Sequence, residues 1–377
     1  ALKARRAARR RTRGTAADQV SGAWDEIVDR ARDLGPQARS TVTRHLALMT
    51  ADLVIEKRHS GPATRYALPQ ATPTAPAATL ATPGQPAGSG FAFSAGHQAL
   101  IDALRAPIGT RKHVTYQRSF LEDYEPNQST LLPPELAEEL FEKGRARGQQ
   151  PAGTYARKVL EQLLIDLSWH SSRLEGNRKS LLDTKRLFEQ GHAEEGDVES
   201  LMLLNHKECI EFVVDAVPEY GITYPVVCNI QSVLMQGLLT NPEGLGQVRK
   251  HVVNITDSVY IPLQRPLIIE ELLKLIIEKA RNIKNPVEAA FFLWVNLAYL
   301  QPFEDGNKRT SRLCANLPLL LQNCAPLSFL DVERDDYALA VVAVYEQQHP
   351  ALAAALFAWP YRRSIDKYAA VPEAMGL

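Results

Sequence analysis

The chain has 377 residues, of which 45% are hydrophobic and 23% charged, and its 43 Lys and Arg side chains balance 43 Asp and Glu side chains. A chain of this length and composition can bury a large core, and its length predicts two or three globular domains. No apolar run reaches the ~18 residues that a membrane span needs, and Leu267–Ile277 is interrupted by Glu270, Glu271 and Lys274. We therefore expect a soluble protein without a transmembrane segment.

The balanced charge conceals an uneven distribution. Residues 1–70 hold 14 basic and 7 acidic groups, a net charge of +7, and the remainder holds 29 and 36, a net charge of −7. Residues 1–14 carry seven basic side chains but no apolar stretch or cleavage site of a secretory signal. The four cysteines form no C-x-x-C pair and no zinc spacing, which indicates small buried side chains in a reducing cytoplasm.

An uncharged segment separates the two halves. In residues 69–90, 18 of the 22 residues are Pro, Ala, Thr or Gly. This composition buries too little apolar area to offset the entropy of ordering the chain. We predict a linker over residues 69–96, between a small head of residues 1–68 and a larger body that follows.

The head shows the pattern of two helices and a hairpin. Apolar side chains recur at helical spacing over residues 20–34 and 40–52, and Ser40 suits the N-cap of the second helix. Residues 53–58 and 64–68 predict two strands around a turn. Helix, turn, helix and basic hairpin together resemble the winged helix-turn-helix of bacterial regulators.

That resemblance implies DNA binding. Thr41 and Arg44 of the second helix would face base edges in the major groove, and Arg58 and Arg65 of the hairpin would meet phosphates. A winged helix that reads a palindrome usually acts as a pair, so we expect a homodimer. A small domain used for protein contact is the alternative.

The body has the periodicity of a mainly α protein with one hairpin. His251–Pro262 is rich in β-branched residues that alternate with polar ones, and predicts a short hairpin. Elsewhere apolar residues follow helical spacing over residues 155–217, 267–283, 286–300, 309–322 and 335–358.

The segment Leu300–Leu313, LQPFEDGNKRTSRL, links two of these helices and has the features of a phosphate site. Its loop leads into a helix N-terminus, where backbone N–H groups and the helix dipole favour anions. Lys308, Arg309 and Arg312 add three cations, and Asp305 adds the carboxylate that a magnesium–phosphate site requires. A capped helix with surface cations has the same pattern.

This segment resembles the motif H-P-F-x-[D/E]-G-N-G-R-x-x-R of the Fic-domain (Fido) family. Gln301 stands at the position of the motif histidine, and Lys308 stands at the second glycine. The positions that match in register are Pro302, Phe303, Asp305, Gly306, Asn307, Arg309 and Arg312.

Two further segments support the resemblance. Ser171 to Asn177 is similar to the inhibitory motif [S/T]-x-x-x-E-[G/N] of the family, through Ser171, Glu175, Gly176 and Asn177. The predicted hairpin lies where Fic domains carry the flap that holds a target segment. The resemblance implies a Fic-type helical bundle with a β-hairpin flap, behind a small N-terminal winged-helix domain.

The domain boundaries follow from this resemblance. Residues 97–150 are expected to form an N-terminal arm and residues 151–365 the Fic domain, with the inhibitory helix near residues 171–177. Residues 366–377 are expected to form a C-terminal tail.

Fic enzymes are nucleotidyltransferases that transfer AMP from ATP to protein hydroxyls, here of an unidentified target. The resemblance implies that Asp305 holds Mg²⁺ and that Glu175 pairs with Arg312 in competition with ATP, which is autoinhibition. The implied nucleotide-binding residues are Gly306, Asn307, Lys308, Arg309 and Arg312.

Gln301 is the departure with the largest consequence. A carboxamide does not titrate near neutral pH, so it cannot act as the general base, which is worth ~10²–10⁴ in rate. The sequence leaves three functions open: a weak or inactive adenylyltransferase, a non-catalytic nucleotide-sensing regulator that acts through the winged helix, and a phosphotransferase like the Doc toxin branch, which has a similar G-N-K-R ending.

Overall fold

The computed structural model describes residues 56–58, 65–67, 90–146 and 151–374. The chain divides into two compact units, Ala1–Gln85 and Pro86–Leu377. Each unit is described by itself.

The described part of the first unit is a two-stranded sheet. Strands β1 (Glu56–Arg58) and β2 (Arg65–Ala67) pair antiparallel, with Arg58 opposite Arg65. The pairing agrees with the predicted hairpin. The two predicted helices, with Thr41 and Arg44, and linker residues 69–89 lie outside the described residues.

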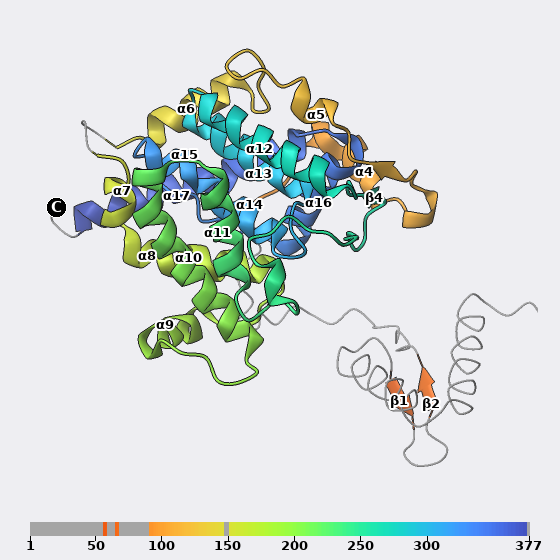
Figure 1. The fold of residues 1–377 in the computed structure, drawn as a ribbon, viewed down its shortest axis with the longest axis horizontal. Coiled ribbons are helices and arrows are strands. Elements are labelled where there is room, and N and C mark those ends of the chain that lie inside the picture. The colour runs from red at the N-terminus through yellow and green to blue at the C-terminus, as the bar shows by residue number, and fades with distance from the viewer. Residues whose placement is uncertain (1–55, 59–64, 68–89, 147–150, 375–377) are drawn as a thin grey trace, which may run out of the picture. The chain divides into compact units, whose positions relative to one another are not determined.

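The second unit is mainly helical, as predicted (Figure 1). None of its described helices has the length and apolar character that crossing a bilayer needs. The α-helices are α4 (Gln98–Arg105), α5 (Ser119–Glu122), α6 (Pro134–Gly144), α7 (Thr154–Lys158), α8 (Leu160–Leu174), α9 (Leu181–Gln190), α10 (Val198–Tyr220), α11 (Tyr224–Met235), α12 (Pro266–Asn282), α13 (Pro286–Leu300), α14 (Asn307–Cys314), α15 (Asn316–Leu321), α16 (Arg334–Gln347) and α17 (Ala351–Ala374). The 3₁₀ turns are η1 (Ala95–His97), η2 (Ile108–Thr110) and η3 (Pro242–Gly244), and the strands are β3 (Val114–Thr115) and β4 (Tyr260–Ile261).

Helix α13 lies at the centre of this bundle. All of its residues are buried, and it packs against α6, α12, α14, α15, α16 and α17 (Figure 1). A helix that is apolar all round must be covered on every side, and α13 has a single charged residue, Glu288, in its first turn. Asn285 caps it by accepting from the N–H groups of Val287 and Glu288. Gln301, which directly follows the last residue of α13, is therefore positioned by a helix in the middle of the core.

The prediction of a hairpin over His251–Pro262 is wrong. Strand β4, at the end of this segment, pairs parallel with β3 of the N-terminal arm, with Val114 opposite Tyr260. The backbone of Val259 shows why: its carbonyl accepts from Val114 N–H, and its N–H donates to the carboxylate of Glu346 in α16. Both ladder groups at this residue are used by other parts of the chain, so a local hairpin cannot form there.

The ends of the predicted segments also differ. Helix α17 runs to Ala374, so most of the expected C-terminal tail is helical, and Tyr368 is buried and donates to Asp166. At the other end, the ring of Phe91 lies 5.5 Å from that of Trp359, so residues placed in the linker pack on the bundle. The four cysteines are free and buried, as expected.

Candidate functional site

The loop from α13 to α14 is held in shape by its own side chains. Asn307 accepts from the N–H of Phe303 and donates to its carbonyl, both at 2.8 Å, and the ring of Phe303 is fully buried. Gly306 is the N-cap of α14 in the left-handed conformation, with φ 77°. A Cβ on Gly306 would lie 2.8 Å from two atoms of Met235, so this position requires glycine.

We expect Gly306→Ala to lower the free energy of unfolding by about 2–4 kcal/mol, because it adds left-handed strain to overpacking against Met235. The matched control is Gly191→Ala, where φ is 76° and nothing lies within 4 Å of an added Cβ. That control carries the conformational cost alone, about 1–2 kcal/mol. Equal losses in urea titrations of the two variants would show that Met235 does not restrict the loop.

The loop borders a cavity of about 920 Å³. Its walls come from the motif loop, from residues 253–257, from α16, and from Arg105 and Arg111 of the N-terminal arm. Clefts of this size hold cofactors and other ligands of similar size. Leu174 and Glu175 line it as well, so the motif loop and the segment Ser171–Asn177 share one cavity.

Arg309 is one of the residues that line this cavity. Its side chain is 7% exposed, and Nη2 lies 3.6 Å from Asp305 Oδ2. Among the described residues, Nη1 has no hydrogen-bond partner. Burial lowers the pKa of Arg309, although a guanidinium remains charged at neutral pH. The positive charge of Arg309 and the N-terminus of α14 together favour an anion such as phosphate.

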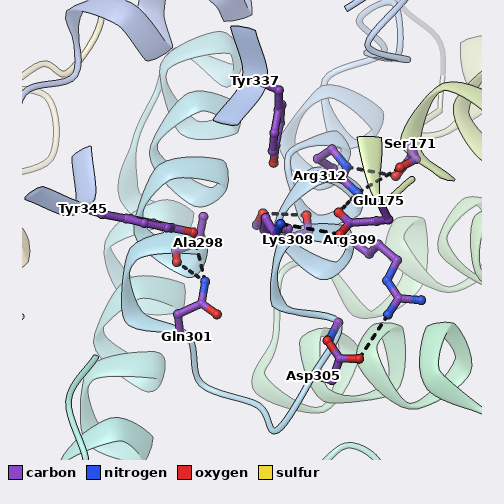
Figure 2. Close-up of polar contacts among 12 residues, drawn as sticks. Ser171, Glu175, Ala298, Gln301, Asp305, Lys308, Arg309, Arg312, Tyr337 and Tyr345 are labelled. Carbon is purple, nitrogen blue, oxygen red and sulfur yellow. Dashed lines mark hydrogen bonds and ion pairs between the residues drawn. The ribbon is translucent and has the colours of Figure 1, made fainter. Parts of the chain in front are cut away.

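Glu175 pairs with the other two cations of the site, Arg312 and Lys308. It follows the last residue of α8, and its Oε1 lies 2.6 Å from Nη2 of the fully buried Arg312. Its Oε2 lies 3.6 Å from Lys308 Nζ. Figure 2 shows the Glu175 carboxylate between these two cations. Burial opposes its ionisation, but Arg312, and then Lys308 and Arg309, lower the pKa of Glu175 to about 2.

Gln301 lines the same cavity but lies apart from these charges, and its carboxamide nitrogen is turned toward Ala298 and Tyr345 (Figure 2). It is 5% exposed in the left-handed conformation that ends α13, with φ 51°. Its carboxamide nitrogen donates to the carbonyl of Ala298 at 2.6 Å and to the hydroxyl of Tyr345 at 3.0 Å. Both donors are used inside the protein, and the group cannot take a proton from a substrate.

Asp305 fits a magnesium–nucleotide complex better than a protein-only metal site. Its side chain is 66% exposed at the cavity, and Oδ1 accepts from the N–H of Gly306 at 2.6 Å. The described residues contain no group of three or more His, Cys, Asp or Glu side chains suited to hold a metal. Mg²⁺ usually takes one or two carboxylates together with phosphate oxygens and water, so a single carboxylate is enough where phosphates are bound.

Arg249 is a residue whose importance the sequence analysis missed. It is 2% exposed, its Nε donates to the carbonyl of Gln301 at 2.6 Å, and its backbone N–H donates to that of Pro302. Its guanidinium also donates to Gln264 and to the carbonyls of His251 and Leu263. It joins the motif loop to residues 250–264. The signal in the sequence was the position of this arginine, two residues before the predicted hairpin.

The structure brings predicted site residues together in two groups. Asp305 and Arg309 form one pair, and Ser171, Glu175, Lys308 and Arg312 form a second group. Gly176, with φ 93°, and Asn177, which donates to the carbonyl of Glu199, hold the end of α8.

Residues 221–319 match the family model described as the Fic/DOC family. This part of the chain is a Fic/DOC-family domain. The protein adenylyltransferase Fic of Nematostella vectensis is 25% identical over 223 residues, which cover 55% of this chain and 49% of that protein. The chain therefore spans about half the length of this curated relative.

Solved structures share the fold of the Fic domain and its surroundings. A Fic-domain-containing signaling protein from Bacteroides thetaiotaomicron has a TM-score of 0.51 at 17% identity, over 64% of this chain and 97% of that one. A Fic family protein from Desulfovibrio desulfuricans has a TM-score of 0.50 at 16% identity, over 66% and 77%. At these identities the likeness concerns the fold alone. The motif loop lies inside the Fic domain, whereas Glu175 precedes it.

Proposed function

We propose that the second unit binds ATP with Mg²⁺ in the cavity, that Glu175 restrains this binding, and that AMP transfer to protein hydroxyls is slow because of Gln301. The observation that carries the proposal is the cavity of about 920 Å³ that Asp305, Lys308 and Arg309 line at the N-terminus of α14. The name of the relative from Nematostella vectensis supports the choice of reaction.

The side chains divide the work between binding and restraint. Asp305 would hold Mg²⁺, and Lys308 and Arg309 would contact the phosphates together with the first N–H groups of α14. Arg312 would bind phosphate oxygens only after Glu175 leaves, because it is fully buried and Glu175 lies between it and the cavity. ATP and the inward position of Glu175 are therefore alternatives for the same cations.

AMP transfer needs a proton acceptor that Gln301 does not supply. The hydroxyl oxygen of the target would bond to the α-phosphorus. The bond between that phosphorus and the oxygen that links it to the β-phosphate would break, and pyrophosphate would leave. The hydroxyl proton must go to a base during this step. Bound ATP supplies the activated phosphoryl group, and the chain supplies orientation and charge.

The Glu175→Gly variant is expected to bind ATP with Mg²⁺ at least about tenfold more tightly than the wild type, because a competing carboxylate has gone. Isothermal titration calorimetry measures this, and Glu175→Gln separates charge from size. The matched control is Glu189→Gly, which removes an exposed carboxylate near the end of α9 and should leave ATP affinity unchanged. If neither Glu175 variant binds ATP more tightly than this control, the restraint is refuted.

A nucleotide-sensing regulator is the second candidate. The inward hydrogen bonds of Gln301 favour it, since they suit binding better than turnover. In this case the first unit would bind DNA, with a second copy on a palindrome, and ATP would change that binding in the full chain. Arg44→Ala should weaken DNA binding, and an ATP effect of less than about twofold would remove the coupling.

The position of a radioactive label distinguishes the two transfer reactions. Label from the α-phosphate of ATP enters the protein in AMP transfer. Label from the γ-phosphate alone would instead identify the phosphotransferase reaction.

A further inference from the structure

A buried hydrogen-bonded chain lies behind the Arg312–Glu175 pair. Ser171 Oγ accepts from Arg312 Nε at 2.9 Å and lies 3.0 Å from Nε2 of His206 on α10. The carbonyl of Ser171 accepts from Arg312 Nη2 at 3.1 Å. Arg312, Ser171 and His206 have no exposed surface. Helices α14, α8 and α10 therefore meet through three buried side chains, which do not line the cavity while Glu175 is in place.

The partners of His206 fix the direction of these bonds. Nδ1 lies 2.9 Å from the carbonyl of Met202, which can only accept, so Nδ1 carries the proton. In the neutral ring Nε2 is then an acceptor, and the Ser171 hydroxyl must donate to it. The Ser172 hydroxyl, 3.4 Å from Nδ1, is a weaker second partner. Burial lowers the pKa of His206 to about 3, so the ring is neutral at pH 7.

We infer that His206 is a positioning residue for Arg312: by accepting a hydrogen bond from the Ser171 hydroxyl, it turns a lone pair of Ser171 Oγ toward Arg312 Nε. This contact does not involve Glu175. When Glu175 leaves, Arg312 loses its carboxylate partner but keeps Ser171 and the ring of Tyr337, which lies 5.0 Å from its guanidinium carbon. The guanidinium then stays in place to bind a phosphate. The phosphate-binding part of this inference rests on the proposed function.

The first test needs no nucleotide. Proton exchange of the Arg312 Nε–H is measured by NMR in the full chain, with the signal assigned by its loss in Arg312→Lys. We expect exchange to be at least about tenfold faster in His206→Leu, which has no acceptor, and close to wild type in His206→Gln, whose carbonyl oxygen replaces Nε2. Comparable melting temperatures show that both variants are folded. Equal exchange in His206→Leu and wild type overturns the inference, and so does equal acceleration in both variants.

The second test uses ATP and AMP as probes in the Glu175→Gly protein. Adding His206→Leu should weaken ATP binding about tenfold and AMP binding less than about twofold, because Arg312 serves the outer phosphates. Adding it to Glu175→Gly/Ser171→Ala should change nothing further, since the effect passes through Ser171. Parallel losses for ATP and AMP, or an undiminished loss without Ser171, contradict a positioning role. If Glu175→Gly binds no ATP, the proposed function fails, and the exchange measurement decides the role of His206 alone.

Discussion

In the Glu175→Gly background, Gln301→His is expected to raise the rate of AMP transfer by about 10²–10⁴, the usual worth of a general base. The backbone accepts the change, because position 301 has φ 51° and histidine is among the residues that tolerate the left-handed region. One ring nitrogen can donate to the carbonyl of Ala298, as the carboxamide now does, and the other then remains an acceptor.

The measurement is incorporation of ³²P from α-labelled ATP, with Mg²⁺, into the protein's own hydroxyl groups. The control is Gln301→Asn in the same background, which suits the same backbone but has no base and should stay at the parent rate. If the histidine variant binds ATP yet labels no faster than the asparagine variant, the AMP-transfer proposal is wrong and the nucleotide-sensing function is favoured.

Arg249→Met is expected to lower the free energy of unfolding by about 3–5 kcal/mol. Methionine fills much of the same volume, so the loss comes from polar groups that remain buried without a donor. These include the carbonyls of Gln301 and Leu263 and the side chain of Gln264. The variant also disconnects the motif loop from residues 250–264, so ATP affinity should fall.

Urea denaturation at pH 7 measures this effect. Arg178→Met is the control, because its side chain is 87% exposed and its removal should cost less than about 0.5 kcal/mol. A loss for Arg249→Met as small as that of the control would mean that water replaces the guanidinium, and that this arginine is not what holds the loop.

Local patterns predicted what local interactions determine. The sequence of α13, apolar on all sides, specifies a buried helix wherever it packs, and the loop that ends in Gly306 and Asn307 closes on itself. The Glu175–Arg312 contact was also expected, although only through the resemblance to a family. The prediction of a hairpin over His251–Pro262 failed because the hydrogen-bond partners of this segment, Val114 and Glu346, lie far away in the sequence.

The roles of His206 and Arg249 were beyond reach for the same reason. Neither residue has a local pattern that shows burial, and both act on groups that folding brings to them. The inward turn of Gln301 depends on Tyr345 of α16, which comes 44 residues later. Side-chain direction at such positions is a property of tertiary packing, which a single sequence does not display.

Residues 253–257 of the cavity wall lie between two anchoring contacts, which affect how quickly a ligand can enter and leave. Arg249 holds the chain before residues 253–257, and after them Glu346 accepts from Ser258 and Val259 and pairs with Arg111 at 2.8 Å. The span between them is held by an exposed hydrogen bond from Arg111 to the carbonyl of Asp257 and by the packing of Ile255 on the core. We expect opening of this span to break only these contacts and to leave the two anchors in place, so it should cost less free energy than global unfolding and allow ligand exchange even in a very stable protein.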